Sequence, residues 1–388
     1  MAQCKFCGEE ECQRHAYTIG KKPSRKEFIG SSPPEIFVGR WNYPNVYTGI
    51  LAPEEQGDTQ VLSSHEEWHK RKLSIPEITS LRSRLIYGRT QQHITKAREK
   101  NKFTEAMHEI AMTHKSIATE FRLKKPVHRH TENHSTTPLI ARAAPVENVK
   151  LQENAPVKPK VDYLVNDSGV KSAQAMQELY TANIPTSTIM KLLSAGLLGR
   201  KTARIMVPTR WSITAVDDTL SKQKLEKIRL FQELSEIRIF TAEYLGNHYE
   251  FILLPGPYAF EVIEIAMASE GVWHDYESNF PRKTYADSVT GAYYANRLAL
   301  TEYCEKIKRQ CQCLVLREVR PEYDAPCGVG ILRETSREAF AKSYETPSTL
   351  TEAFKQVQSR LRLPIERFTE KSWILKNYGK QKRLTEFF

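Results

Sequence analysis

Four side chains in the first fifteen residues have the types and spacing of a metal site: Cys4, Cys7, Cys12 and His15. A Cys-x2-Cys pair forms a knuckle that points two thiolates at one ion, and Gly8 permits the turn. The following Cys-x2-His pair repeats this geometry with one imidazole. Three sulfurs and one nitrogen complete a tetrahedral site with no open position, which predicts a structural Zn²⁺ ion. An iron–sulfur cluster is the alternative, disfavoured by the histidine and the tight spacing.

A second possible metal site is the pentapeptide from His65 to His69, which satisfies the His-Glu-x-x-His pattern of zinc hydrolases. That chemistry needs both histidines on one helical face, Glu66 as general base and a third ligand downstream. Three cations, residues 70–72, follow at once and oppose the binding of a dication. A zinc hydrolase is therefore only a remote alternative.

Two stretches combine arginine with aromatic residues, as sites that bind phosphates and stack bases do. In the first, Ser31 and Ser32 lie in a turn-rich segment whose backbone N–H groups could bind a phosphate. A short apolar strand follows, and then Arg40, Trp41 and Tyr43, which could clamp a base. The alternative is a β-hairpin whose aromatic side chains pack inward.

The second stretch has Arg210 and Trp211 after a short predicted strand, followed by Asp217 and Asp218. The two carboxylates either cap the next helix, where acids are favourable, or hold Mg²⁺ near a phosphate. Arg82, on the flank of a predicted helix, is a further candidate for phosphate binding. If the two stretches converge, they form one site for a small nucleotide; separation by more than roughly 15 Å would exclude this.

The last eight residues form a recognition pattern of another kind. Leu384, Phe387 and Phe388 fall on one face of a single helical turn, and Gln381 precedes them as a two-way hydrogen-bonding group. This ending is similar to the PCNA-interacting peptide (PIP motif) of proteins that bind the replication sliding clamp. It predicts PCNA as a partner; the alternative is a terminal helix that packs on its own domain.

The elements that must position these residues predict an α+β fold, an antiparallel sheet flanked by helices, with a small N-terminal zinc knuckle. Periodicity and turn residues predict helices at 76–89, 91–121, 173–180, 186–198, 219–234, 288–310, 350–361 and 365–378, and strands at 205–207, 236–245, 248–254, 258–267 and 311–319. The expected organisation is a zinc knuckle (1–20), a basic helix-rich region (21–125), a linker or long loop (126–160), an α+β domain (161–375) and a flexible tail (376–388).

Composition limits the partners and the compartment. The 388 residues have a net charge of +11, and residues 1–160 hold 26 Lys and Arg against 18 Asp and Glu, so DNA contact is expected in the N-terminal part. No apolar run reaches the roughly 18 residues of a membrane span, and we expect a cytoplasmic, nucleoid-associated protein. Seven cysteines, an odd number, oppose a disulfide framework; Cys304, Cys311, Cys313 and Cys327 are expected to be core thiols.

With these motifs in hand, the chain resembles archaeal NreA-type DNA repair proteins over most of its length. The resemblance is carried by the Cys/His knuckle, the clamp-binding ending and four internal strings: Gly30-Ser-Ser-Pro-Pro34, Phe37-Val-Gly39-Arg40 with Tyr43-Pro44, Leu193-Ser-Ala-Gly-Leu-Leu-Gly199, and Val207-Pro-Thr-Arg-Trp-Ser-Ile-Thr-Ala-Val-Asp-Asp218. It implies participation in DNA damage repair through the sliding clamp, and no known enzymatic reaction. The alternatives are a nucleotide-binding enzyme or sensor and, remotely, the zinc hydrolase.

The two metal hypotheses predict different zinc contents. A single structural knuckle gives one zinc ion per chain by elemental analysis, and Cys7→Ser should remove it because one thiolate ligand is lost. His65→Ala should leave the content at one ion. Two ions in the unmodified protein, with one lost in His65→Ala, would support the hydrolase site instead.

Overall fold

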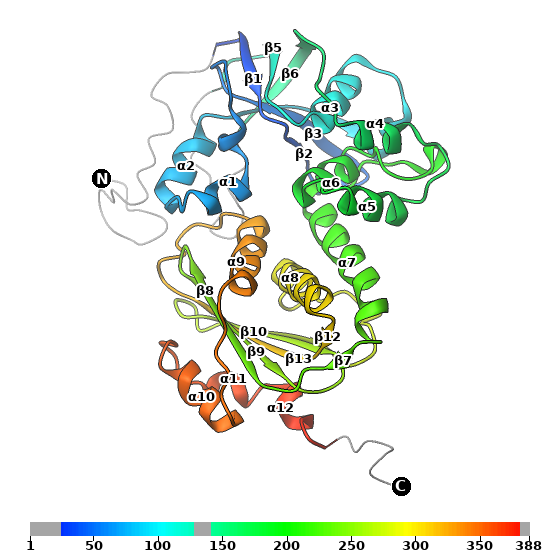
Figure 1. The fold of residues 1–388 in the computed structure, drawn as a ribbon. Coiled ribbons are helices and arrows are strands. Elements are labelled where there is room, and N and C mark those ends of the chain that lie inside the picture. Colours follow the sequence, from blue (N-terminus) through cyan, green and yellow to red (C-terminus); the bar gives the residue numbers. More distant parts are fainter. Residues whose placement is uncertain (1–24, 128–140, 381–388) are drawn as a thin grey trace, which may run out of the picture. The chain divides into compact units, whose positions relative to one another are not determined.

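The computed structural model describes residues 25–127 and 141–380. The chain divides into two compact units, Met1–Thr219 with Asp324–Gly328, and Leu220–Tyr323 with Val329–Phe388 (Figure 1). The division falls inside the long helix α7 (Thr209–Ile228). The predicted zinc ligands, Cys4 to His15, and the predicted clamp-binding residues, Gln381 to Phe388, lie outside the described residues.

Unit 1 is built on a six-stranded mixed sheet with the order β1-β5-β6-β4-β3-β2. The β4–β6 pair is parallel and the other pairs are antiparallel. The strands are β1 (Glu27–Ser32), β2 (Ile36–Val38), β3 (Asn45–Ala52), β4 (Ile86–His93), β5 (Ile117–Leu123) and β6 (Arg142–Leu151). β5 shows why this sheet forms, since its residues alternate between buried and more exposed positions along the strand.

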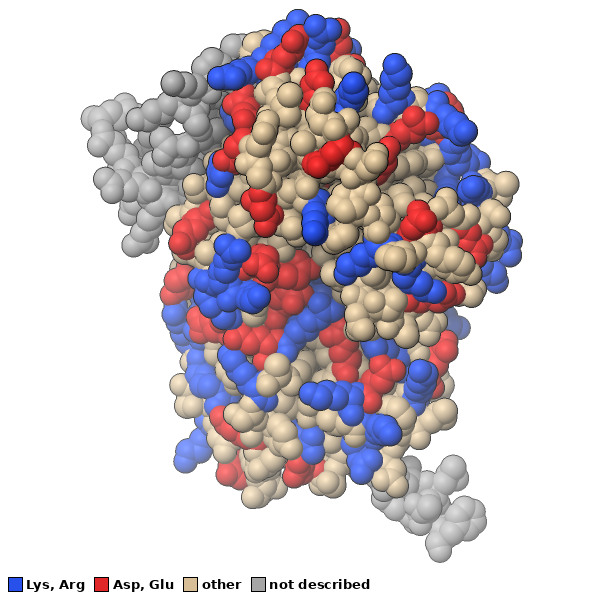
Figure 2. Space-filling view, turned by 45° about the horizontal axis from the view of Figure 1, so that its top comes forward, with Lys and Arg blue, Asp and Glu red and all other residues tan. Residues whose placement is uncertain are grey.

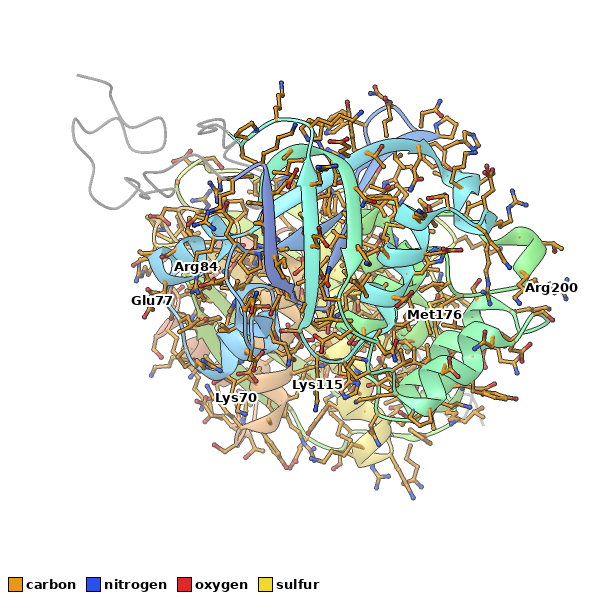
Figure 3. The ribbon with its side chains drawn as sticks, turned by 90° about the horizontal axis from the view of Figure 1, so that it is seen from above. Lys70, Glu77, Arg84, Lys115, Met176 and Arg200 are labelled. Atoms are coloured by element: carbon orange, nitrogen blue, oxygen red, sulfur yellow. The ribbon has the colours of Figure 1, made fainter. Side chains whose placement is uncertain are left out.

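The helices of unit 1 flank this sheet. They are α1 (His65–Lys70), α2 (Ile75–Ser83), α3 (Lys102–Met112), α4 (Pro159–Asn166), α5 (Ser172–Thr181) and α6 (Thr186–Ser194), with 3₁₀ turns η1 (Gln60–Leu62), η2 (Ile94–Arg98) and η3 (Lys201–Ala203). In Figure 3, Lys70, Glu77 and Arg84 of the α1–α2 region lie at one side of the sheet and Met176 and Arg200 at the other.

Unit 2 has a five-stranded mixed sheet with the order β11-β10-β13-β9-β8, in which only the β10–β13 pair is parallel. Its elements are β8 (Arg238–Tyr244), β9 (Asn247–Leu254), β10 (Ala259–Ala266), β11 (Val272–Glu277), α8 (Gly291–Ile307), β13 (Gln312–Val319), α9 (Val329–Ala341), α10 (Leu350–Gln358), α11 (Glu366–Thr369) and α12 (Trp373–Asn377). The short strands β7 (Gln232–Glu233) and β12 (Arg309–Gln310) form a separate parallel pair.

Helices cover both faces of the unit 2 sheet, α8 and α9 on one face and α10 to α12 on the other (Figure 1). β9 is consequently buried along its whole length. Phe251 and Leu253 pack in the core on the α8–α9 side, whereas Ile252 and Leu254 pack in the core on the α10–α12 side. The continuous apolar run of this strand therefore reflects two buried faces.

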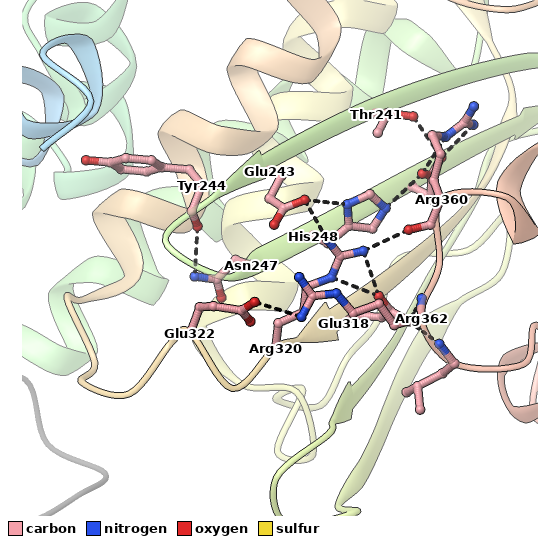
Figure 4. A network of polar contacts seen from close by, with 12 residues as sticks. Thr241, Glu243, Tyr244, Asn247, His248, Glu318, Arg320, Glu322, Arg360 and Arg362 are labelled. Carbon is pink, nitrogen blue, oxygen red and sulfur yellow. Dashed lines mark hydrogen bonds and ion pairs between the residues drawn. The ribbon is translucent and has the colours of Figure 1, made fainter. Parts of the chain in front are cut away.

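Buried charges in unit 2 are neutralised by a network of ion pairs (Figure 4). His248 contacts Glu243 at 3.2 Å and Glu250 at 2.9 Å. Arg320 contacts Glu318 at 3.0 Å, and Arg360 contacts Glu250 at 2.8 Å. Because Glu250 and Glu318 are fully buried, Arg360 and Arg320 are required to hold the carboxylates inside the fold.

Several sequence expectations about unit 2 are confirmed. The hairpin β8–β9 forms, and its turn residues Leu245 and Gly246 have φ values of 52° and 72°. The third strand, the long helix and the last strand appear as β10, α8 and β13. Cys304, Cys311 and Cys313 of unit 2, and Cys327 of unit 1, are buried free thiols. The α+β class is also confirmed, but both main sheets are mixed rather than antiparallel.

Other expectations are wrong, mostly in unit 1. Residues 91–121 were expected to form one helix, but they contain the end of β4, η2, α3 and most of β5. Asn101 caps α3 at its start, and Thr113 at its end has an extended backbone. Residues 205–207 form no strand. The segment expected to be a linker or long loop contributes β6, which pairs with β5 and β4.

No helix among the described residues is long and apolar enough to cross a membrane.

His108 of α3 should make the stability of the protein depend on pH. Burial lowers its pKa from 6.5 to about 4, the charge of Arg204 adds to this effect, and a 3.0 Å contact between Nε2 and the Ala195 carbonyl opposes it. Between pH 6.5 and 4 the His108 imidazole binds a proton in the unfolded chain but stays neutral in the folded chain. The free energy of unfolding therefore decreases as the pH falls through this window.

We therefore expect His108→Gln, which keeps a donor for the Ala195 carbonyl, to reduce the loss of stability on going from pH 7.5 to pH 5 by about 2 kcal/mol. Thermal unfolding at both pH values measures the effect, which corresponds to a change of roughly 4–8 °C in the pH-dependent shift of Tm. If the shift of Tm between the two pH values is the same in His108→Gln and the unmodified protein, His108 is not the source of the pH dependence.

Candidate nucleic-acid interface

The two Arg–aromatic stretches identified in the sequence meet in unit 1. Tyr43, in the turn between β2 and β3, contacts Trp211, in the first turn of α7, with ring centroids 5.1 Å apart and planes inclined by 51°. About 170 residues separate β2 from α7, yet Val38 donates its backbone N–H to the Thr209 hydroxyl at 2.9 Å. The separation that would have excluded a common site is therefore absent.

A chain of hydroxyl hydrogen bonds fixes this meeting point. The Ser194 hydroxyl donates to the Val207 carbonyl at 2.8 Å and lies 3.1 Å from the Thr209 hydroxyl. Since a serine hydroxyl has a single proton, Thr209 must be the donor in its contact with Ser194. Thr209 thus accepts from Val38 of β2 and donates to the end of α6, which holds the start of α7 beside the β2–β3 turn.

The string from Leu193 to Gly199 completes this support. Gly196 has a φ of +75°, and a Cβ there would lie 2.6 Å from the Ala97 Cβ and 2.8 Å from the Ile205 carbonyl oxygen. Only glycine therefore allows this close approach. The neighbouring Ala195 carbonyl contacts His108 of α3. The string is a structural support for the interface and provides none of its exposed side chains.

The aromatic side chains at the meeting point are exposed. Trp41 is 74% exposed, Tyr43 45% and Trp211 44%. The Arg40 guanidinium lies over the Trp41 ring, 4.7 Å from its centroid. The stretch is a hairpin, as one interpretation proposed, but its aromatic residues do not pack inward.

Exposed cations lie on the same segments as the aromatic residues and on the segments bonded to them. Arg40 and Arg210 are exposed neighbours of Trp41 and Trp211 in the sequence. Backbone hydrogen bonds link the Tyr43-Pro44 turn to η2 and η2 to the segment before α7: Ile94 N–H donates to the Pro44 carbonyl at 3.0 Å, and Met206 N–H donates to the Ile94 carbonyl at 2.9 Å. Three more exposed cations lie on the segments that these bonds connect: Arg98 on η2, and Arg200 and Lys201 at η3.

Arg98 and Arg200 are placed by the same segments. Arg98 of η2 donates to the Thr202 carbonyl at 2.6 Å, which holds it against η3, and Arg200 projects from the loop before η3 (Figure 3). Elsewhere the surface is mixed: on the face drawn in Figure 2, Lys and Arg alternate with Asp and Glu without forming one basic field. We call the set Arg40, Trp41, Tyr43, Arg98, Arg200, Lys201, Arg210 and Trp211 the aromatic–basic surface.

The other phosphate candidates have structural surroundings. Ser31 and Ser32 are buried in β1, where the Ser31 N–H donates to the Glu55 carbonyl at 2.8 Å and its hydroxyl accepts from Gly57 N–H at 2.9 Å. Arg82 is 6% exposed and forms a 3.1 Å ion pair with Glu35. Ser31 and Arg82 form bonds within the fold, Ser32 is buried, and none of the three is part of the aromatic–basic surface.

Asp217 and Asp218 do not cap a helix. α7 begins at Thr209, ten residues earlier than expected, so both carboxylates lie in its interior. Asp217 is fully buried. With a rise of about 1.5 Å per residue, Asp218 lies roughly 10 Å along the helix axis from Trp211.

The His-Glu-x-x-His segment forms α1, a helix of six residues. The Nε2 atom of His69 lies 3.4 Å from the Lys72 ammonium, and the His65 ring packs on Trp68 with centroids 4.7 Å apart. Trp68 is buried and donates its indole N–H to the Val61 carbonyl. In residues 25–127 and 141–380 no group of three or more His, Cys, Asp or Glu side chains could hold a metal ion.

Sequence reasoning identified the exposed aromatic residues but missed the polar groups that bring them together. The hydroxyls of Ser194 and Thr209 lie in strings that carry the family resemblance, but neither residue was a candidate for the site. Their spacing of fifteen residues carries no periodic signal, because the partner of Thr209, the Val38 N–H, is set by tertiary structure. Lys201 was not a candidate for the site, and Arg98 lies in a segment for which one long helix was predicted, so its position beside η3 could not be foreseen.

Known protein families match this chain over nearly its whole length. Residues 4–274 match the family model "Archaeal Nre, N-terminal", and residues 277–387 match "Archaeal Nre, C-terminal". The DNA repair protein NreB of Archaeoglobus fulgidus is 35% identical over 391 residues, covering 98% of this chain and 97% of that protein.

Two further relatives carry the name DNA repair protein NreA. The one from Archaeoglobus fulgidus is 31% identical and covers 92% of this chain and 94% of its own. The one from Haloferax volcanii is 31% identical and covers 88% of this chain and 85% of its own. No solved structure matches the chain at a significant level.

Proposed function

Because the chain belongs to the archaeal Nre family of DNA repair proteins, we propose that it acts as a repair factor recruited to DNA by the PCNA sliding clamp and that it contacts DNA itself. The observation that carries the DNA contact is the convergence of Tyr43 and Trp211, with their neighbouring arginines, on one exposed surface. Recruitment rests on the pattern of the last eight residues.

Gln381, Leu384, Phe387 and Phe388 are the proposed clamp-binding residues. An aliphatic and two aromatic side chains on one face of a turn suit a preformed apolar pocket, and Gln381 supplies a hydrogen-bonding group beside them. Anchoring three apolar groups, less the cost of ordering the segment, corresponds to an affinity of about 1 μM.

The chain just before this peptide is firmly attached to unit 2. Glu261 of β10 is fully buried and accepts hydrogen bonds from the Ser372 hydroxyl at 2.6 Å and from the backbone N–H of Ile374 at 2.9 Å. Ser372 in turn caps α12 by accepting from Leu375 N–H at 3.1 Å. The proposed peptide thus begins four residues after the end of an anchored helix, which gives it a short connection to unit 2.

The aromatic–basic surface is the proposed DNA contact. Its five exposed cations suit a phosphate backbone, and contacts of this kind give an affinity that falls steeply with salt.

A structural Zn²⁺ held by Cys4, Cys7, Cys12 and His15 is proposed to fold the N-terminal segment, since so short a segment cannot build a core without a metal.

A small nucleotide is the second candidate ligand of the same surface. The 5.1 Å contact of Tyr43 with Trp211 favours it, because the two stretches are close enough to share one phosphate-bearing ligand. The Asp217–Asp218 pair would then hold Mg²⁺ some distance along α7. This candidate makes the protein an enzyme or sensor, and it predicts saturable binding of a mononucleotide in the presence of Mg²⁺.

The clamp interaction is tested by pull-down with purified PCNA. We expect a chain ending at Lys380 to lose binding, and the double variant Phe387→Ala/Phe388→Ala to lose at least tenfold in affinity, because both aromatic anchors are removed. Thr385→Ala, which lies outside the apolar face, is the matched control and should bind like the full chain. Equal binding by the full chain and the chain ending at Lys380 would refute recruitment through this segment.

A further inference from the structure

We propose that the aromatic–basic surface binds unpaired DNA bases, so that the preferred substrate is single-stranded DNA rather than duplex. This inference rests on the proposed DNA contact and specifies its substrate. Trp41, Tyr43 and Trp211 are the stacking residues, and the exposed cations around them hold the phosphate backbone.

The exposure of the three rings points to stacking. A single exposed aromatic residue is ordinary, but here three of them lie in two segments that the Thr209 hydroxyl holds together. Trp41 is exposed by 74% in a tight turn, although the core of unit 1 begins a few residues away at Val38 and Val46, each at most 1% exposed. The fold therefore presents this indole to solvent.

Their geometry suits bases that have left a helical stack. The Tyr43 and Trp211 rings are inclined by 51° to each other, so they do not cover one another face to face. Arg40 lies over one face of Trp41. Aromatic faces bind the flat surfaces of bases with little dependence on sequence, and those surfaces are accessible only when the bases are unpaired.

The charges favour a strand over a single nucleotide. Arg40 and Arg210 flank the rings, while Arg98, Arg200 and Lys201 continue along η2 and η3. A mononucleotide can use only a fraction of these cations at once, whereas several consecutive phosphates can use most of them. Alternating aromatic and cationic side chains along a surface are typical of single-strand binding.

Binding is measured by fluorescence anisotropy with the full chain, a labelled 20-nucleotide thymine strand and a 20-base-pair duplex. We expect tighter binding of the strand. Trp41→Ala and Trp211→Ala should each weaken strand binding by about 5- to 100-fold, because one stacked base is lost. Neither change should alter duplex binding by more than about twofold.

Two matched variants control for side effects. Phe280 of unit 2 is 78% exposed, so Phe280→Ala removes an equally accessible aromatic side chain and should leave strand binding unchanged. Thr209→Val removes the hydroxyl that joins β2 and α6 and should weaken strand binding, whereas Thr209→Ser keeps the hydroxyl and should not. Circular dichroism and thermal unfolding verify that each variant is folded.

The outcomes separate the inference from the proposed function. If neither strand nor duplex binds, the proposed DNA contact itself fails. If Arg40→Ala and Arg210→Ala weaken both DNAs and reduce the salt dependence while Trp41→Ala and Trp211→Ala have no effect, DNA contact stands and base stacking is overturned. If thymidine triphosphate with Mg²⁺ displaces the strand at an equal nucleotide concentration, the surface is a nucleotide site and the inference is also overturned.

Discussion

The Thr209 hydroxyl is the group on which the candidate interface depends. It accepts a hydrogen bond from Val38 at the end of β2 and contacts Ser194 at the end of α6, so three segments far apart in the sequence meet at one atom. The Ser194 hydroxyl in turn donates a hydrogen bond to the Val207 carbonyl. Hydrogen bonds in such a chain polarise and strengthen one another, which suits a junction that must hold two exposed rings in register.

In unit 2 the main physical constraint is the burial of charged side chains. Its sheet is buried on both faces, and carboxylates such as Glu250 and Glu261 lie fully inside. Glu250 is compensated by the charge of Arg360 and also contacts His248, whereas Glu261 accepts from hydroxyl and backbone donors at the start of α12 and contacts His274. The second arrangement ties the end of the described chain to a central part of the sheet. A peptide that follows α12 is therefore attached close to an inner strand of this sheet.

Sequence patterns predicted unit 2 much better than unit 1. The β8–β9 hairpin and α8 combine long apolar runs with clear turn residues, so local signals and the tertiary fold agree there. Residues 91–121 mislead because the apolar set of α3, which includes Met107 and Ile110, extends in phase into the strand residue Ile117. β6 was missed because its strand lies beyond a proline- and histidine-rich segment and its partners are distant. The exposed aromatic residues could be recognised individually, whereas their meeting required the tertiary bonds of Thr209.

The exposure of Trp41 also indicates which kind of ligand the aromatic–basic surface can bind. An enzyme site for a small molecule is usually concave and removes most of its ligand from water. Here the rings are exposed by 44% to 74%, and the carboxylates nearest in sequence, Asp217 and Asp218, lie two turns away inside α7. Such a surface can bind a polymer, but it removes little of a bound ligand from water. Its chemistry therefore suits the proposed binding of a DNA strand better than the alternative binding of a mononucleotide.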